Sequence, residues 1–131
     1  MIGIDTNVLI RILVKDDEKQ AQLAFNYITN SCINSSIVIN SIVFCEVVWV
    51  LESAYNYTKE EIINCLLHIL KTKQFLIPDK EIIRLALTLY QETKIDFSDA
   101  LIGCKNKLEN CEFTITFDKE AAKTNLYKLL K

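Results

Sequence analysis

Five acidic residues are placed where carboxylates can gather around one site. Four of them come directly after an apolar run or near the start of an expected helix, and the fifth lies inside an apolar run. They are Asp5, Glu46, Asp96, Asp99 and Asp118. Clustered carboxylates repel one another, and a folded protein tolerates them when a divalent cation neutralises the cluster. Oxygen ligands favour Mg²⁺ or Mn²⁺ over zinc.

The segment "SIVFCEVVWVL", residues 41–51, carries a single acid among apolar residues. If this segment is a helix, nearly every face is apolar, so we expect Glu46 to be buried. A buried carboxylate costs several kcal/mol unless it is paired, protonated or bound to a metal. Glu46 lies too deep in the expected helix to cap it, which leaves a metal, a buried ion pair or a protonated acid as its explanation.

The other four acids also have purely structural explanations. Asp5 can cap a helix that starts at Thr6, and Asp118 can cap the last helix. Asp96, with Asp99 three positions later, resembles a capping box. Both readings stay open for each residue, and the five acids together indicate more than any one of them.

Hydrophobic periodicity predicts helices that alternate with short apolar strands. The strands are expected within residues 1–5, 35–40, 74–78 and 112–117, and the helices within 6–14, 16–30, 41–51, 58–70, 80–91, 96–110 and 118–130. Residues 42–51 are rich enough in β-branched side chains to suit a strand as well. Apolar strands between helices are typical of a parallel sheet covered on both faces. Such sheets place their sites beyond the carboxyl ends of the strands, where the acids are expected.

The composition excludes several classes of function. The 131 residues suit one domain, and the net charge of −2 argues against a broad basic surface for nucleic acid. With one histidine (His68) and two glycines, the chain has no Ser–His or Cys–His catalytic pair and no glycine-rich phosphate loop. Five scattered cysteines without a CxxC pair fit free thiols in a reducing compartment, and we expect no secretion signal and a cytoplasmic location.

Four motifs in this order and spacing resemble the PIN domain. They are "IDTNVLIR", "SIVFCEVVWVLE", "DFSDALIGC" and "TFDK", and they look most like those of VapC-type toxins from toxin–antitoxin pairs. The resemblance covers essentially the whole chain. It implies a single domain over residues 1–131, folded as a three-layer α/β/α sandwich around a parallel sheet of four to five strands.

The resemblance also implies an activity and a set of site residues. It implies an endoribonuclease that depends on Mg²⁺ or Mn²⁺, with Asp5, Glu46, Asp99 and Asp118 as metal-binding and catalytic acids and Asp96 second to Asp99. Thr6, Asn7 and Thr116 match polar positions beside the site. By position alone, Arg11, Lys15 and Lys105 are candidates for RNA contact. Family knowledge further implies a homodimer and a cognate antitoxin protein.

Three other functions remain open from the sequence. A PIN fold that only binds RNA or a protein partner would keep the fold without the chemistry, and a DNA-cutting nuclease would keep the acids. A phospho-receiver domain also binds Mg²⁺ on a parallel sheet, but it needs paired acids after the first strand. Here Asp5 is followed by Thr6 and Asn7, which is a poor match.

Overall fold

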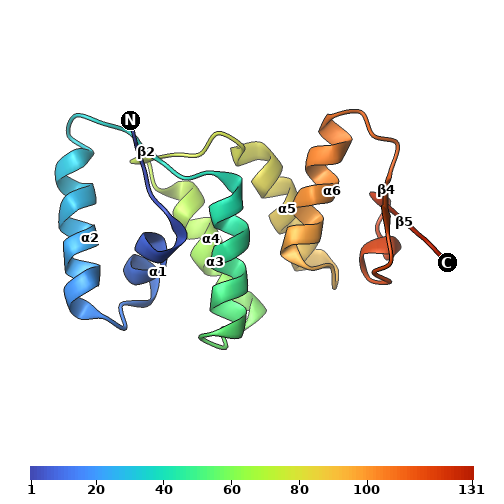
Figure 1. The fold of residues 1–131 in the computed structure, drawn as a ribbon, viewed down its shortest axis with the longest axis horizontal. Coiled ribbons are helices and arrows are strands. Elements are labelled where there is room, and N and C mark those ends of the chain that lie inside the picture. Colours follow the sequence, from blue (N-terminus) through green and yellow to red (C-terminus); the bar gives the residue numbers. More distant parts are fainter. The chain divides into compact units, whose positions relative to one another are not determined.

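The computed structural model describes residues 1–131, which divide into two compact units (Figure 1). The first unit comprises residues 1–78 and the second residues 79–131, and each is described by itself. Pairs of helices separate most of the short strands along the chain, and every strand pair is parallel. The predicted α/β fold class is therefore confirmed, while the prediction of one domain over residues 1–131 stays a prediction.

The first unit is built on a three-stranded parallel sheet in the order β1–β2–β3. The strands are β1 (Ile2–Gly3), β2 (Ile37–Val38) and β3 (Phe75–Leu76), and Ile37 lies opposite both Ile2 and Phe75. Ile37 is fully buried, and Ile39 just beyond β2 is fully buried too. The central strand therefore runs through the core, as its β-branched sequence predicts.

Four helices complete the first unit, and each begins at a polar residue that caps it. They are α1 (Thr6–Val14), α2 (Glu18–Ser31), α3 (Ser41–Ser53) and α4 (Lys59–Lys71), capped by Asp5, Asp17, Asn40 and Thr58. The capping box of Thr58 and Glu61 is present as predicted. Helix α1 packs against α2 and α3, and α3 packs against α4. Residues 42–51 are helical, which decides between the two structures that their sequence allowed.

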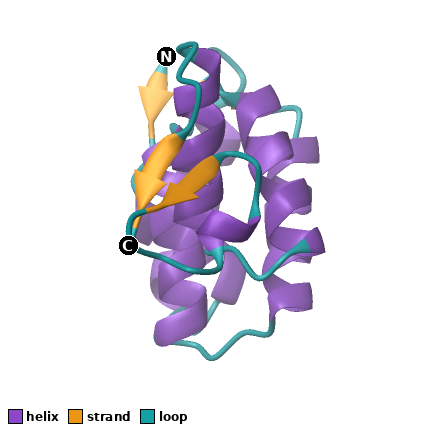
Figure 2. Cartoon of the chain, turned by 90° about the vertical axis from the view of Figure 1, so that its right-hand side faces the viewer, coloured by secondary structure: helices purple, strands orange, loops and turns teal.

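The second unit contains two packed helices and a pair of parallel strands (Figure 2). The helices are α5 (Lys80–Glu92) and α6 (Phe97–Leu108), and the strands are β4 (Thr114–Thr116) and β5 (Tyr127–Leu129). The protein thus has five strands, the upper number predicted. They are divided between a three-stranded sheet and a two-stranded sheet.

The helix predicted for residues 118–130 is wrong. The chain forms a short 3₁₀ helix, η1 (Ala121–Lys123), and then strand β5. The side chains of Asp118 and Thr124 bond to the backbone of Ala121, at its N–H (2.8 Å) and its carbonyl (2.7 Å). Local side-chain bonds of this kind compete with a continuing helix. Beyond them Tyr127 is buried, Lys128 exposed and Leu129 half-buried, the alternation of a strand.

Length and hydropathy both separate these helices from membrane-spanning ones. The longest, α2, has 14 residues, and none is long and apolar enough to cross a bilayer.

Candidate active site

Asp5 lies where strand β1 meets helix α1. Its backbone is extended, and its Oδ1 accepts a hydrogen bond of 3.1 Å from the Val8 N–H, so Asp5 is the N-cap of α1. The capping reading is therefore confirmed, but one bond uses only part of what a carboxylate can accept. The side chain remains exposed, as does the neighbouring Asn7. Asp5 can cap the helix and still offer oxygen to a ligand.

Glu46 is exposed, which corrects the prediction that it is buried. Helix α3 buries one broad stripe, formed by Val43, Phe44, Val47, Val48 and Leu51. Its other face carries Glu46 between Ile42, which is 68% exposed, and Trp49, which is 69% exposed. The apolar run misled the prediction because hydrophobic residues are also common on surfaces.

Thr6 joins the first turn of α1 to Glu46 on α3. The Thr6 hydroxyl donates a hydrogen bond of 2.7 Å to Glu46 Oε1. Thr6 is the neighbour of Asp5 in the chain. The bond therefore holds Glu46 beside Thr6, one residue from Asp5. The first unit therefore brings Asp5, Thr6 and Glu46 into one region, and the supporting role of Thr6 stays a prediction.

Asp96 and Asp99 stand at the start of α6, and Asp96 does not act as a side-chain cap. Asp96 occupies the N-cap position, but its side chain makes no capping hydrogen bond. Asp99 follows in the first turn and is half-buried. The capping box that their spacing suggested is therefore absent. Both carboxylates lie at the positive end of the helix dipole, which stabilises negative charge.

Asp118 follows strand β4 and begins the turn that leads to η1. Its N–H donates to Thr116 Oγ1 at 2.9 Å, and its Oδ1 accepts from the Ala121 N–H at 2.8 Å. The capping reading holds in part, since Asp118 caps a 3₁₀ turn instead of the predicted α-helix. Thr116 contacts the backbone of Asp118, and its supporting role at the site stays a prediction.

Two acids of the second unit, Asp96 and Asp118, act electrostatically on the third, Asp99. The pKa of Asp99 is raised above its ordinary value, chiefly because burial disfavours the charged form. The negative charges of Asp96 and Asp118 raise it further. A bound cation would relieve this repulsion, so the second unit has the electrostatics that a divalent metal fits.

No metal site is complete within either unit. Neither unit holds three His, Cys, Asp or Glu side chains close enough together to bind one ion. However, none of the five acids forms an ion pair with a lysine or arginine. Their carboxylate oxygens are the donors that Mg²⁺ and Mn²⁺ prefer. The residues present therefore fit such an ion chemically.

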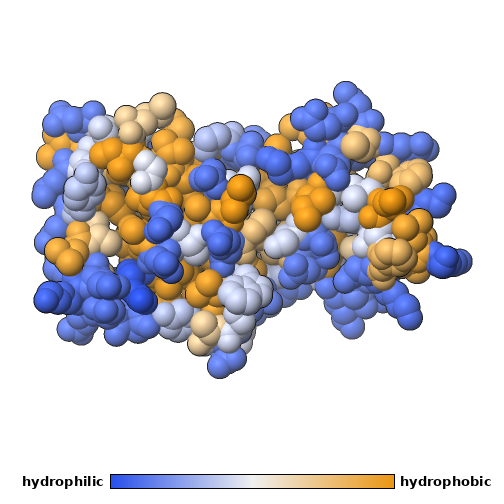
Figure 3. Space-filling model, in the orientation of Figure 1, coloured by the Kyte–Doolittle hydropathy of each residue, from blue (hydrophilic) through white to orange (hydrophobic).

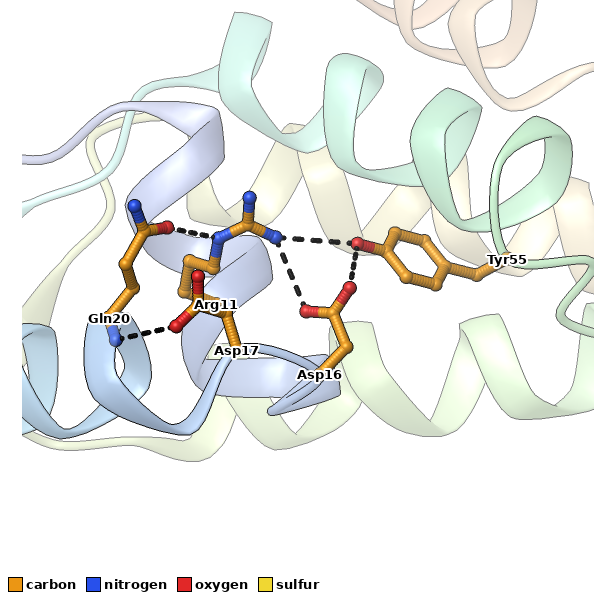
Figure 4. Close-up of polar contacts among 5 residues, drawn as sticks. All are labelled: Arg11, Asp16, Asp17, Gln20 and Tyr55. Atoms are coloured by element: carbon orange, nitrogen blue, oxygen red, sulfur yellow. Dashed lines mark hydrogen bonds and ion pairs between the residues drawn. The ribbon is translucent and has the colours of Figure 1, made fainter.

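Two of the three candidate RNA-contact cations are already engaged. Arg11 donates from Nε to Gln20 Oε1 (2.5 Å) and from Nη1 to Asp16 Oδ1 (3.2 Å), and the Tyr55 hydroxyl donates to the other oxygen of Asp16 (2.8 Å) (Figure 4). The hydrogen bond from Tyr55 is the main reason why the pKa of Asp16 is lowered. Together, these hydrogen bonds connect the turn between α1 and α2 to Tyr55, just after α3.

The other two candidates, Lys105 and Lys15, lie in different surroundings. Lys105 is 3.0 Å from Asp79 Oδ2, so its charge is also paired. Lys15 is exposed just after α1, in the left-handed conformation that ends the helix. Contact with RNA stays a prediction for Arg11, Lys15 and Lys105.

A groove beside Asp5 runs between strand β1 and helices α1 and α2. Its volume is about 750 Å³, and its polar lining includes Asp5, Asn7, Arg11 and Gln20. Apolar residues of α2 complete its wall, among them Leu23 and Tyr27, which are 64% and 62% exposed. Apolar side chains also reach the visible surface over the first unit, between polar patches (Figure 3). A ligand bound in this groove would lie against both Asp5 and the apolar residues of α2.

One residue that contacts the acids was missed by the sequence analysis. The Tyr127 hydroxyl donates a hydrogen bond of 2.6 Å to the backbone carbonyl of Asp99. Residues 118–130 were predicted to be helical, and that prediction gave no reason to place Tyr127 beside α6. The alternation of apolar and polar residues in "YKL" was the signal that could have indicated a strand.

Comparison with known proteins gives one family and one curated relative. Residues 2–126 match the PIN domain family. A VapC ribonuclease from Aquifex aeolicus (strain VF5) is 27% identical over 120 residues, which cover 92% of this chain and 89% of that relative. No solved structure gives a significant match. The match spans all five acids and nearly the full length, so the chain belongs to the PIN domain family.

Proposed function

We propose that this protein is a metal-dependent endoribonuclease, and that it is the toxin of a type II toxin–antitoxin pair of the VapBC kind. The observation that carries the proposal is a set of five carboxylates without cationic partners in a PIN-family chain. The name of the relative, a VapC ribonuclease, supports RNA as the substrate. A PIN fold that only binds RNA or a protein has no need of acids left unpaired.

The proposed metal ligands come from both units of the chain. Asp5 and Glu46 belong to the first unit and Asp99 and Asp118 to the second, with Asp96 as an additional ligand beside Asp99. A divalent cation bound by such carboxylates lowers the pKa of a water and neutralises charge on a scissile phosphate. Mg²⁺ or Mn²⁺ suits an all-oxygen set.

The supporting residues orient these carboxylates. The Thr6 hydroxyl occupies one lone pair of Glu46 Oε1, which fixes the side chain and leaves Oε2 to face a ligand. Thr116 holds the backbone N–H of Asp118, which sets where that acid leaves strand β4. Hydrolysis by in-line attack of water is expected to leave a 5′-phosphate and a 3′-hydroxyl. This route needs no histidine, and His68 is exposed on α4.

The proposed partners follow from the proposal that this protein is a VapC-type toxin. A cognate antitoxin is expected to bind the active-site groove, and the toxin is expected to form a homodimer. A small open reading frame immediately upstream of the gene would favour the toxin over a DNA-cutting nuclease. Co-expression of its product should suppress the toxicity of this protein.

The activity is tested with purified protein free of antitoxin. Wild type, Asp5→Asn and Glu46→Gln are incubated with total RNA and with a tRNA pool, in Mg²⁺, in Mn²⁺ and in EDTA, and the products are mapped by end sequencing. Glu60→Gln is the matched control, because Glu60 is an exposed glutamate in the first turn of α4.

We expect discrete cuts with 5′-phosphate ends from wild type and from Glu60→Gln. EDTA and the two active-site substitutions should each lower the rate at least about 100-fold. If folded wild type is as inert as both variants and binds no divalent metal, the protein is not a nuclease. Cleavage that persists in EDTA would show that the acids do not act through a metal.

A further inference from the structure

We propose that Tyr127 is a positioning residue that holds the β4–β5 sheet on the first turn of α6, and thereby fixes Asp118 relative to Asp99. This inference rests on the proposed function, because it concerns the acids assigned to the metal. Tyr127 lies just outside residues 2–126, the range that matches the PIN domain family.

The contact of Tyr127 with α6 is short and buried. Its hydroxyl donates to the Asp99 carbonyl at 2.6 Å, and the residue is 8% exposed. The acceptor is the backbone of Asp99, so any shift of the tyrosine moves the Cα from which that carboxylate extends. Tyr127 does not touch the carboxylate itself and leaves its oxygens available to a ligand.

Gly103 makes this close approach possible. It lies one turn after Asp99 on α6, and a Cβ there would be 2.8 Å from Tyr127 Cε2 and 3.1 Å from Leu126 Cδ1. Real Cβ atoms do not approach a ring carbon so closely, so any larger residue would push the ring away. One of the two glycines in the chain therefore stands where the aromatic ring packs on the helix.

The sheet carries the position of Tyr127 to Asp118. Tyr127 pairs with Thr114 and Leu129 pairs with Thr116, and the Leu130 N–H donates to the Thr116 carbonyl at 2.8 Å. The Thr116 hydroxyl in turn accepts from the Asp118 N–H. Hydrogen bonds and the backbone of β5 and β4 together thus connect the Asp99 carbonyl to Asp118.

Repulsion between the acids explains why a link of this kind is needed. Asp99 and Asp118 carry like charges close enough to affect each other, and without a cation they repel. That repulsion would move the end of β4 away from the start of α6. A second tie, from Asn106 Nδ2 to Thr114 Oγ1 (3.0 Å), lies near the other end of α6 and leaves the acidic end to Tyr127.

The test compares Tyr127→Phe with Tyr55→Phe. Both variants keep the ring and remove a hydroxyl that donates a hydrogen bond, and Tyr55 lies in the first unit on Asp16. Mn²⁺ affinity is measured by titration calorimetry on the protein without RNA, Tm by thermal unfolding, and kcat and KM by RNA cleavage. Gly103→Ala is a second variant that keeps the hydroxyl but displaces the ring.

We expect Tyr127→Phe and Gly103→Ala to weaken Mn²⁺ binding about tenfold, the usual size of an effect from a residue that supports a metal ligand. Their kcat should fall at limiting metal while KM for RNA stays unchanged. Tyr55→Phe should lower Tm by a similar amount and bind Mn²⁺ as wild type does. A loss of Tm without a loss of Mn²⁺ affinity in both Tyr127→Phe and Gly103→Ala would overturn the inference.

The two proposals fail in different ways in this experiment. Wild type that binds Mn²⁺ and cuts RNA, together with a Tyr127→Phe variant that matches it, refutes only the role of Tyr127. Wild type that neither binds Mn²⁺ nor cuts RNA refutes the nuclease, and the role of Tyr127 with it.

Discussion

Thr6 and Glu46 show how a single hydroxyl can organise a site. Their hydrogen bond joins two helices whose residues are 40 positions apart in the chain. Threonine next to the first acid could be recognised from the sequence as a supporting residue, but its partner could not. The spacing of α1 and α3 decides which acid the hydroxyl reaches, and that spacing depends on how the two helices pack.

We expect Thr6→Val to impair metal binding more than folding. Valine keeps the shape of threonine and removes the bond to Glu46 Oε1, so the carboxylate loses its fixed orientation. Mn²⁺ affinity should fall about tenfold, while the free energy of unfolding should fall by about 1 kcal/mol or less, since the bond is exposed. Calorimetric titration and urea unfolding measure the two quantities.

Thr6→Ser is the control for this prediction, because serine keeps the hydroxyl. It should bind Mn²⁺ nearly as wild type does. Equal losses in the serine and valine variants would show that the methyl group, and not the hydrogen bond, is what matters at this position.

Tyr127 should make the protein sensitive to alkaline pH. Burial, followed by the charge of Asp99, raises the pKa of Tyr127 to about 12. An unfolded tyrosine ionises near pH 10, so between the two values the unfolded state loses the proton while the folded state keeps it. Stability from this group is complete below pH 10 and is lost as the pH rises toward 12.

The measurement is the free energy of unfolding at pH 9 and pH 11 for wild type and Tyr127→Phe. Wild type should lose about 1 kcal/mol more than the variant over this interval. The variant serves as the control for lysines and the other tyrosines, which also ionise there. An identical pH dependence in both proteins would mean that Tyr127 ionises as freely folded as unfolded.

At the scale of elements, local signals predicted the helices well and the last segment badly. Helices α1, α3 and α4 begin where Asp5, Asn40 and Thr58 predict, because a cap acts on backbone groups only two or three residues away. Residues 118–130 have helical periodicity, but Thr124 bonds back to Ala121 and Tyr127 finds a partner on α6. That partner lies 28 residues away, beyond the reach of local pattern.

The exposure of Glu46 also could not be predicted from the local sequence. An apolar helix sequence shows which residues can be buried, but the number of neighbouring elements decides how many are. Helix α3 packs against α1 and α4, and its third side keeps Ile42 and Trp49 in contact with solvent. The role of Glu46 as a metal ligand stays a prediction from its place in a motif, while the reason first given for it, burial, was wrong.

Asn40 should contribute measurably to α3. Its side-chain oxygen accepts from the N–H groups of Ile42 (2.9 Å) and Val43 (3.2 Å), which otherwise have no partner in the helix. Asn40→Ala should lower the free energy of unfolding by about 1 kcal/mol in urea denaturation. Asn34→Ala, in the exposed turn after α2, should change it by less than about 0.5 kcal/mol.

The result for Asn40 separates two explanations of this helix start. If both asparagine variants unfold alike, the N-terminus of α3 is held by packing of Phe44 and its neighbours and not by its cap. Near-normal Mn²⁺ binding in Asn40→Ala would show that Glu46, more than one turn further on, does not depend on the cap.

At the scale of the whole molecule, the proposed metal ligands are divided between two compact units. The family match runs through both units without interruption. The sequence predicted all five acids from their positions in motifs that resemble those of PIN domains, and their role as ligands stays a prediction. It could not assign a strand to each sheet, because strands of two or three residues carry too little pattern to select a partner.

We expect Mn²⁺ to raise Tm of the whole protein. A ligand that binds only the folded state at about 100 times its Kd adds about 2.7 kcal/mol of stability. Glu46→Gln in the first unit and Asp99→Asn in the second should each reduce the rise in Tm, and EDTA should abolish it in wild type. Scanning calorimetry measures these shifts, with Glu60→Gln as the control.

The outcome bears on how the two sets of acids work. A rise that survives either substitution undiminished would show that the substituted acid is not a ligand. Loss of the rise in both variants would show that metal binding depends on an acid of each unit.

The position of strand β5 in the chain has a consequence for the order in which the protein is made. All five acids precede Tyr127, so a ribosome delivers every carboxylate before it delivers the strand that pairs with β4. A nascent chain that already contains Asp118 still lacks the contact between the Tyr127 hydroxyl and Asp99. The synthesis of the last strand would therefore be the step that completes the proposed set of contacts around the acids.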